Sequence, residues 1–143
     1  MTKKRILIIE DEANMRHMLE VLLGKSGYEV KIATDGQEGL DAIERERFHF
    51  ILCDIKMPRM DGMAFLKSAK EKLIDTTVIM MSAYGTVDTA IEAMKLGAYD
   101  YISKPFKTDE VLLTLKKAEE RERLKSEKGK GTTIIVILPL YEK

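Results

Sequence analysis

Four short, mostly apolar segments of this chain each run directly into a reactive side chain. Continuous apolar runs of this length are typical of strands buried on both faces of a parallel sheet. In such a sheet, ligands bind just beyond the carboxyl ends of the strands. We therefore expect carboxylates, a hydroxyl and an ammonium group to meet at one edge, as in a site for a cation and a phosphate group. The segments and the side chains that follow them are Arg5–Ile9 with Glu10 and Asp11, Phe48–Cys53 with Asp54, Thr77–Met81 with Ser82, and Ala98–Ser103 with Lys104.

Helical patterns alternate with these strand-like segments. Apolar residues recur there at the three- and four-residue spacing of an amphipathic helix, and glycines mark the predicted helix ends. The resulting order, βαβαβαβαβα, predicts an α/β fold with a doubly wound parallel sheet. A fifth, half-buried strand is expected at Tyr28–Ala33; the helical patterns are Met15–Leu22 before Gly24 and Gly27, a helix opened by Asp35-Gly36, Met63–Ala69, Val87–Met94 before Gly97, and a last helix from Thr108.

Composition limits the classes of protein that need to be considered. The chain has 143 residues, enough for one domain and little more. Its 24 basic and 24 acidic residues cancel, whereas a nucleic-acid-binding domain usually has a basic excess. No apolar stretch approaches the length of a membrane span or a signal peptide. The lone Cys53 excludes an internal disulfide and fits a core position in a cytoplasmic protein.

The end of the chain differs from the rest. The pattern predicts one domain over residues 1–120, a mostly polar helical extension at 121–128, and an unmatched tail at 129–143. The extension is either solvated, a partner interface, or a linker to a further part of the protein. Thr132–Leu138 is strongly β-prone and uncharged, so we expect it to pair as an added strand or to pack in an apolar groove.

The predicted site suits phosphoryl transfer to a carboxylate. Carboxylate and phosphoryl group are both anionic, so this reaction depends mainly on positioning and on neutralisation of charge. Mg²⁺ is the usual neutralising ion, and it takes oxygen ligands. Glu10, Asp11 and Asp54 offer such oxygens. Lys104 offers a positive charge and Ser82 a hydroxyl donor for phosphoryl oxygens.

Five short motifs give the chain a resemblance to the receiver domain of bacterial two-component response regulators, over about residues 3–120. Each motif alone is weak, but the ordered set is very specific. In addition, Ala83-Tyr84-Gly85 and the long last helix look like receivers of nitrogen-regulatory activators that work through an AAA+ ATPase domain. The five motifs are Glu10-Asp11, Asp54 with Met57-Pro58 and Asp61-Gly62, Ser82-Ala83, Tyr101, and Lys104-Pro105-Phe106.

The resemblance implies a flavodoxin-like fold with five parallel strands in the order 2-1-3-4-5 and five helices, the last one extended. It also implies that Asp54 accepts a phosphoryl group from a sensor histidine kinase. Mg²⁺ would be bound by Glu10, Asp11 and Asp54 together with the main-chain carbonyl of Lys56. Glu10 departs from the commoner aspartate, and its longer side chain reaches a metal more easily through water.

Other positions match the switch of such receivers. Lys104 would contact the phosphoryl group, and a cis peptide bond is expected between Lys104 and Pro105. Ser82 and Tyr101 would form the switch pair: the phosphoryl group draws the Ser82 hydroxyl inward, and Tyr101 turns from solvent into the vacated space. This change would alter the face formed by the fourth helix, fifth strand and fifth helix, to control a homodimer, an output domain or an effector protein.

Three other functions have to be weighed against this switch. A receiver that serves only as a docking module would not use Asp54, but the acceptor set is intact. A Mg²⁺-dependent aspartyl-phosphate phosphatase needs a second aspartate two residues after the nucleophile, where this chain has Lys56. A flavin-binding module would need a phosphate loop where the acidic pair stands. We expect no enzymatic activity beyond self-catalysed phosphorylation and hydrolysis of the acyl phosphate.

Some polar residues have simpler interpretations. Asp61 is expected to be a turn and cap residue, and Arg59 a solvated surface residue. Glu10 or Asp11 is a candidate cap of the first helix as well as a metal ligand. Lys56 and Tyr84 stand where the family tunes access of water to the acyl phosphate, and two bulky groups there should lengthen its lifetime.

Overall fold

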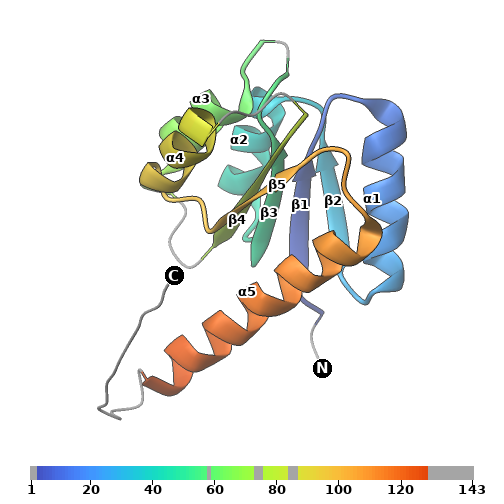
Figure 1. The fold of residues 1–143 in the computed structure, drawn as a ribbon, viewed down its shortest axis with the longest axis vertical. Coiled ribbons are helices and arrows are strands. Elements are labelled where there is room, and N and C mark those ends of the chain that lie inside the picture. The colour runs from blue at the N-terminus through green and yellow to red at the C-terminus, as the bar shows by residue number, and fades with distance from the viewer. Residues whose placement is uncertain (1–2, 58, 73–75, 84–86, 129–143) are drawn as a thin grey trace.

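The computed structural model describes residues 3–57, 59–72, 76–83 and 87–128. Strands and helices alternate along the chain, and the five strands form one parallel sheet in the order β2-β1-β3-β4-β5 (Figure 1). This is the flavodoxin-like fold that the resemblance implied. The elements are β1 (Arg5–Ile9), α1 (Ala13–Lys25), β2 (Glu29–Ala33), α2 (Gly36–Arg45), β3 (Phe50–Asp54), α3 (Gly62–Ala69), β4 (Thr77–Ser82), α4 (Val87–Lys95), β5 (Asp100–Ser103) and α5 (Thr108–Lys128).

Helices cover both faces of the sheet (Figure 1), and each face has its own apolar cluster. α1 and α5 pack on one face, whereas α2, α3 and α4 pack on the other. Successive side chains of a strand point to opposite faces. In β1, for example, Ile6 and Ile8 belong to the first cluster, and Leu7 and Ile9 to the second. The central strands β1, β3 and β4 are therefore apolar except at their ends, which is the pattern that identified them.

The starts of the helices next to the strand ends are fixed by carboxylates. Asp61 caps α3, since its side chain accepts a hydrogen bond from the backbone N–H of Ala64 at 2.9 Å; this confirms the interpretation of Asp61. The cap of α1 is Glu12, and not Glu10 or Asp11 as considered above. Because Glu12 satisfies the first turn of α1, the two preceding carboxylates are available at the end of β1.

Two helices end at glycines with left-handed backbone conformations. Gly97 has φ 107°, and its N–H donates to the carbonyl of Met94, as expected for the residue that follows a helix. After α1 the corresponding residue is Gly27, with φ 100°, whereas Gly24 lies inside the helix. The helix therefore runs past the first of the two glycines that the sequence marked as its end.

α5 continues without a break from the domain into the polar extension. Some of the polar side chains of this extension contact the domain itself. None of the described helices is long and apolar enough to cross a membrane. The tail at 129–143, and with it the predicted added strand, lies outside the described residues. The extension contributes a hydrogen bond between Thr77 and Glu122 and the guanidinium of Arg121 over the ring of Tyr99; just before it, Glu119 accepts a hydrogen bond from the hydroxyl of Tyr28.

Candidate functional site

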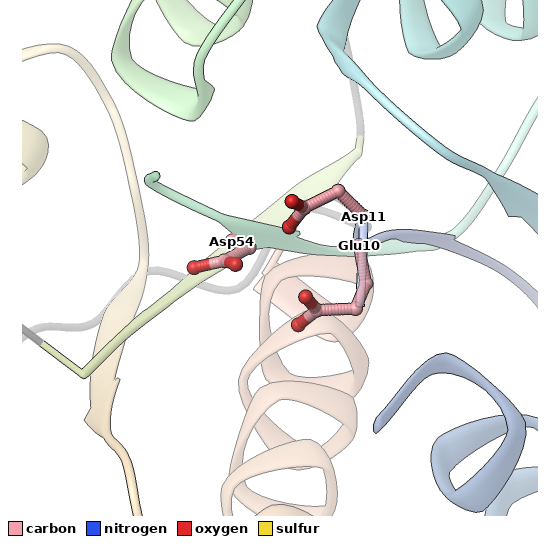
Figure 2. Close-up of side chains that lie close together, drawn as sticks. All are labelled: Glu10, Asp11 and Asp54. Atoms are coloured by element: carbon pink, nitrogen blue, oxygen red, sulfur yellow. The ribbon is translucent and has the colours of Figure 1, made fainter. Parts of the chain in front are cut away.

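The carboxyl ends of β1 and β3 bring three carboxylates together. Glu10 and Asp11 follow β1, and Asp54 is the last residue of β3. One oxygen of each carboxylate lies within 4.8 Å of one oxygen of each of the others, and Figure 2 shows the three groups on the same side of the strand ends. Glu10 is 0% exposed and Asp54 5%, whereas Asp11 is exposed. The acids expected at the site are therefore adjacent, with one of them open to solvent.

Lys104 reaches this cluster from the end of β5. Its ammonium group lies 2.8 Å from Oε1 of Glu10 and 3.2 Å from Oδ2 of Asp54. Burial opposes the charged form, but the hydrogen bonds and charges of the two carboxylates outweigh it and raise the pKa of Lys104. The peptide bond between Lys104 and Pro105 is cis, as the resemblance implied.

Glu10 has an unusual environment for a glutamate. Its pKa is raised to about 7, mainly by burial and further by the charge of Asp54, although the hydrogen bond from Lys104 opposes this rise. The single positive charge of Lys104 therefore does not offset the negative charge of the neighbouring carboxylates. A site with oxygen donors and excess negative charge fits a hard divalent cation such as Mg²⁺. In this structure Glu10, Asp11 and Asp54 could hold such an ion.

Arg16 of α1 binds the backbone of Glu10 and Asp11, a contact that the sequence did not predict. Its guanidinium donates to the backbone carbonyl of Glu10 at 2.9 Å and to that of Asp11 at 3.3 Å. Both acceptors are main-chain atoms, which carry no residue-type pattern. No motif in the sequence therefore indicates this role for Arg16.

The loop between β3 and α3 borders the acidic cluster. Its first residue, Ile55, donates from its N–H to the carbonyl of Met81 at 2.8 Å and accepts from the N–H of Gly62 at 2.7 Å. A Cβ at position 62 would overlap the carbonyl oxygen of Asp54, so the close return of the chain requires glycine there. A cavity of about 320 Å³ opens beside this loop, lined by Ile55, Lys56, Met57, Asp61, Ser82 and Thr89.

Lys56 and Arg59 lie in this loop. The side chain of Lys56 is exposed, and Tyr84, its predicted counterpart, lies outside the described residues. Arg59 is exposed at the surface, as expected, but its guanidinium also forms an ion pair with the buried carboxylate of Asp35. The sequence did not predict this ion pair, because Asp35 lies 24 positions earlier in the chain and has the pattern of a helix cap.

The switch pair lies at the ends of the neighbouring strands. Ser82 ends β4 and is buried, as expected for a hydroxyl at the site. Tyr101 differs from the expectation of a ring that faces solvent, because its hydroxyl oxygen is buried and has no hydrogen-bond partner within the described part of the chain. The ring packs against the apolar cluster that contains Met80, Ala93 and Ala98. Apolar packing thus holds Tyr101 inward, although its hydroxyl finds no partner in the part of the chain that the structure describes.

The parallel sheet, the acidic cluster and the bridging lysine define a class of protein that comparison with known families identifies. The model of the response regulator receiver domain matches residues 6–116. The chain therefore belongs to the response regulator receiver domain family, which confirms the resemblance found in the sequence.

Individual relatives extend this result. The chain is 40% identical over 123 residues to the regulatory protein AtoC of Escherichia coli K12, covering 86% of this chain and 27% of AtoC. It is 40% identical over 119 residues to the transcriptional regulatory protein ZraR of Klebsiella oxytoca, covering 83% of this chain and 27% of ZraR. The chain thus spans about a quarter of the length of these curated relatives.

Solved structures agree with the fold. A CheY-like receiver domain protein from Methanospirillum hungatei JF-1 has a TM-score of 0.83 and 32% identity, with 87% of this chain and 99% of that chain covered. NtrX from Brucella abortus, in complex with ADP, has a TM-score of 0.83 and 32% identity, with 94% of this chain and 31% of that chain covered. The match to NtrX agrees with the nitrogen-regulatory type that the sequence indicated.

Proposed function

We propose that this chain is a phosphoacceptor switch in which Asp54 takes a phosphoryl group from a sensor histidine kinase. The observation that carries the proposal is the position of Lys104, whose ammonium contacts both Asp54 and Glu10 where the strands end. Family membership supports it. In the transfer, a carboxylate oxygen of Asp54 bonds to phosphorus, the bond from phosphorus to the donor's imidazole nitrogen breaks, and the imidazole retains the bonding electron pair.

Glu10, Asp11, Asp54 and the main-chain carbonyl of Lys56 would hold Mg²⁺. When bound, the ion supplies positive charge that offsets the repulsion between the carboxylate and the incoming phosphoryl group. Lys104 provides a second positive charge, and in the phosphorylated chain its ammonium pairs with a phosphoryl oxygen. Asp11 is exposed, so the cluster is open to solvent on the side of Asp11.

Ser82 and Tyr101 would convert phosphorylation into a change of surface. Among the described residues the buried hydroxyl of Tyr101 has no hydrogen-bond partner, which costs about 1–3 kcal/mol and favours alternatives in which the hydroxyl is paired or solvated. A hydrogen bond from Ser82 to the phosphoryl group would then change the balance between two populated states. The surface that responds is that of α4, β5 and α5; large apolar side chains exposed on its helices are Val87, Ile91, Met94, Leu113 and Leu124.

The output that we propose is control of transcription. The relatives AtoC and ZraR are named as regulatory proteins and are about four times as long as the matched segment. We propose that α5 continues into an output domain of the AAA+ type, and that phosphorylation controls this domain or a homodimer. The chain would act in the cytoplasm, would not itself bind nucleic acid, and would catalyse only its own phosphorylation and dephosphorylation.

Incubation with Mg²⁺ and acetyl phosphate tests the acceptor, with intact mass as the readout. We expect one phosphoryl adduct on the native chain and none on the Asp54→Asn variant, whose side chain has the same shape but is a poorer nucleophile. Glu44→Gln, which changes a distant exposed acid, is the matched control and should be phosphorylated normally. A native chain that stays unmodified would favour the docking module, and an equal adduct on Asp54→Asn would refute the assignment.

A further inference from the structure

Arg59 has a backbone conformation that is unusual for its residue type. Its φ is 62°, in the left-handed region, which favours glycine and asparagine. A non-glycine residue stays there only where its surroundings hold it. Arg59 lies in the loop between β3 and α3, three residues after Lys56. The side chain of Arg59 is therefore the first place to look for the restraint.

The guanidinium of Arg59 is bound to a buried carboxylate. Its Nε lies 2.6 Å from Oδ2 of Asp35, and a second guanidinium nitrogen contacts the same oxygen. The other oxygen of Asp35 accepts the N–H of Glu38 at 2.9 Å and caps α2. Asp35 is only 1% exposed, so it needs both partners, and the N–H of Glu38 and the arginine hold its pKa low.

The residues next to this pair are also in close contact. The N–H of Gly36 donates to the carbonyl of Met60 at 3.0 Å. A Cβ at position 36 would approach the side chain and the carbonyl of Met60 to 2.7 Å. The loop therefore lies directly on the N-terminus of α2, through an ion pair and a main-chain hydrogen bond in adjacent positions. At its other end, Ile55 is bound to β4 and to Gly62, as described above.

We propose that the Arg59–Asp35 pair is a latch that positions the backbone carbonyl of Lys56 for the metal ion. This inference rests on the proposed Mg²⁺ site. Lys56 lies between the two anchored points of the loop, Ile55 and Arg59. Without the latch, the chain at Arg59 would relax from its left-handed conformation, and the carbonyl of Lys56 would be in position for only part of the time. The apparent affinity for Mg²⁺ is then the intrinsic affinity multiplied by the fraction of time that the carbonyl is in position.

Mg²⁺ titration of the unphosphorylated chain by isothermal calorimetry tests this role without any phosphoryl transfer. Arg59→Gln removes the positive charge, and Asp35→Asn removes the negative charge but retains the helix cap. Loss of a partner that orients a metal ligand typically weakens metal binding by about 10- to 100-fold. Arg59 acts through the loop, so we expect the lower end, a Kd about tenfold higher in each variant. The double variant should be no weaker than either single variant, because both break the same contact.

Three further variants separate the latch from other causes. Arg59→Gly relieves the left-handed strain but lacks the guanidinium, so it should bind Mg²⁺ as weakly as Arg59→Gln. Arg59→Lys keeps the charge and should bind more tightly than Arg59→Gln. Lys72→Gln is the matched control: it breaks the exposed Lys72–Glu44 ion pair, which also involves α2 but not the loop, and should leave the Kd unchanged.

The outcomes distinguish the latch from the metal site itself. A native chain that does not bind Mg²⁺ would contradict the proposed function. A native chain that binds Mg²⁺, with Arg59→Gln and Asp35→Asn binding equally well, would overturn the latch alone. Circular dichroism of each variant shows that it is folded. If Arg59→Gly binds as tightly as the native chain, the ion pair has no role in positioning the carbonyl, and the proposal is wrong.

Discussion

Replacement of Glu10 by glutamine should change how the stability of the metal-free chain depends on pH. Burial raises the pKa of Glu10 to about 7 from its ordinary value of 4.5. Between these two values, the folded chain holds a proton that the unfolded chain has released. The folded chain therefore loses stability as the pH rises through this range. Glutamine has nearly the same shape as protonated glutamate and does not titrate, so Glu10→Gln should lack this loss.

The magnitude follows from the same pKa. A rise from 4.5 to about 7 corresponds to about 3 kcal/mol of unfolding free energy, which the native chain loses between pH 4 and pH 8 relative to Glu10→Gln. For a domain of this size, that is a large share of the ~5–15 kcal/mol that typically separates folded from unfolded chains. The effect should therefore be measurable without special conditions.

Urea unfolding followed by circular dichroism, in buffer with EDTA, gives the two pH profiles. Glu92→Gln makes the same chemical change at an exposed position of α4, and its profile should follow that of the native chain. Saturating Mg²⁺ should flatten the profile of the native chain, because a cation beside Glu10 favours its ionised form. If the native chain and Glu10→Gln have parallel profiles without metal, Glu10 is not held protonated, and the electrostatic description of the site is wrong.

Three other predictions concern the metal, the switch and the tail. Mg²⁺ at 100 times its Kd should stabilise the native chain by about 3 kcal/mol, and Asp11→Ala should remove most of that gain in thermal melts; an undiminished gain would place the metal elsewhere. Beryllofluoride, a phosphoryl mimic, should change the sedimentation coefficient or the hydrogen exchange of α4, β5 and α5, and no change in either would count against the switch. Deletion of residues 129–143 should leave phosphorylation of Asp54 by acetyl phosphate intact in mass spectra, since the proposed site is complete by Lys104; loss of the adduct would show that the tail contributes to the site.

The sequence was sufficient to predict the sheet and the position of its site. Strands buried on both faces have no polar alternation, so the continuous apolar runs marked the strands and Asp54, Ser82 and Lys104 marked their ends. The boundaries shifted only slightly: β3 begins at Phe50 rather than at Phe48, although Phe48 is buried. The strand order followed from the family resemblance, because apolar runs do not show which strands are neighbours.

The contacts that hold the loops could not be predicted from the sequence. Arg16 binds main-chain carbonyls, and Arg59 pairs with a carboxylate that the chain supplies before β3. Arg59 was predicted as a surface residue and is exposed, but only the folded structure brings its guanidinium to Asp35. The inward orientation of Tyr101 could not be predicted for a related reason: it depends on the packing of the ring in the folded structure, whereas its spacing from Ser82 indicates only a switch residue.

Direct location of the phosphoryl group tests the central claim, which is that Asp54 alone accepts it. After incubation with Mg²⁺ and acetyl phosphate, borohydride reduces an aspartyl phosphate to homoserine, and peptide mass spectrometry then identifies the position of the change. We expect homoserine at position 54 and at no other aspartate, and no conversion when Mg²⁺ is replaced by EDTA. Homoserine at position 11 or 61, or none at all in a chain that carries the phosphoryl adduct, would contradict this assignment.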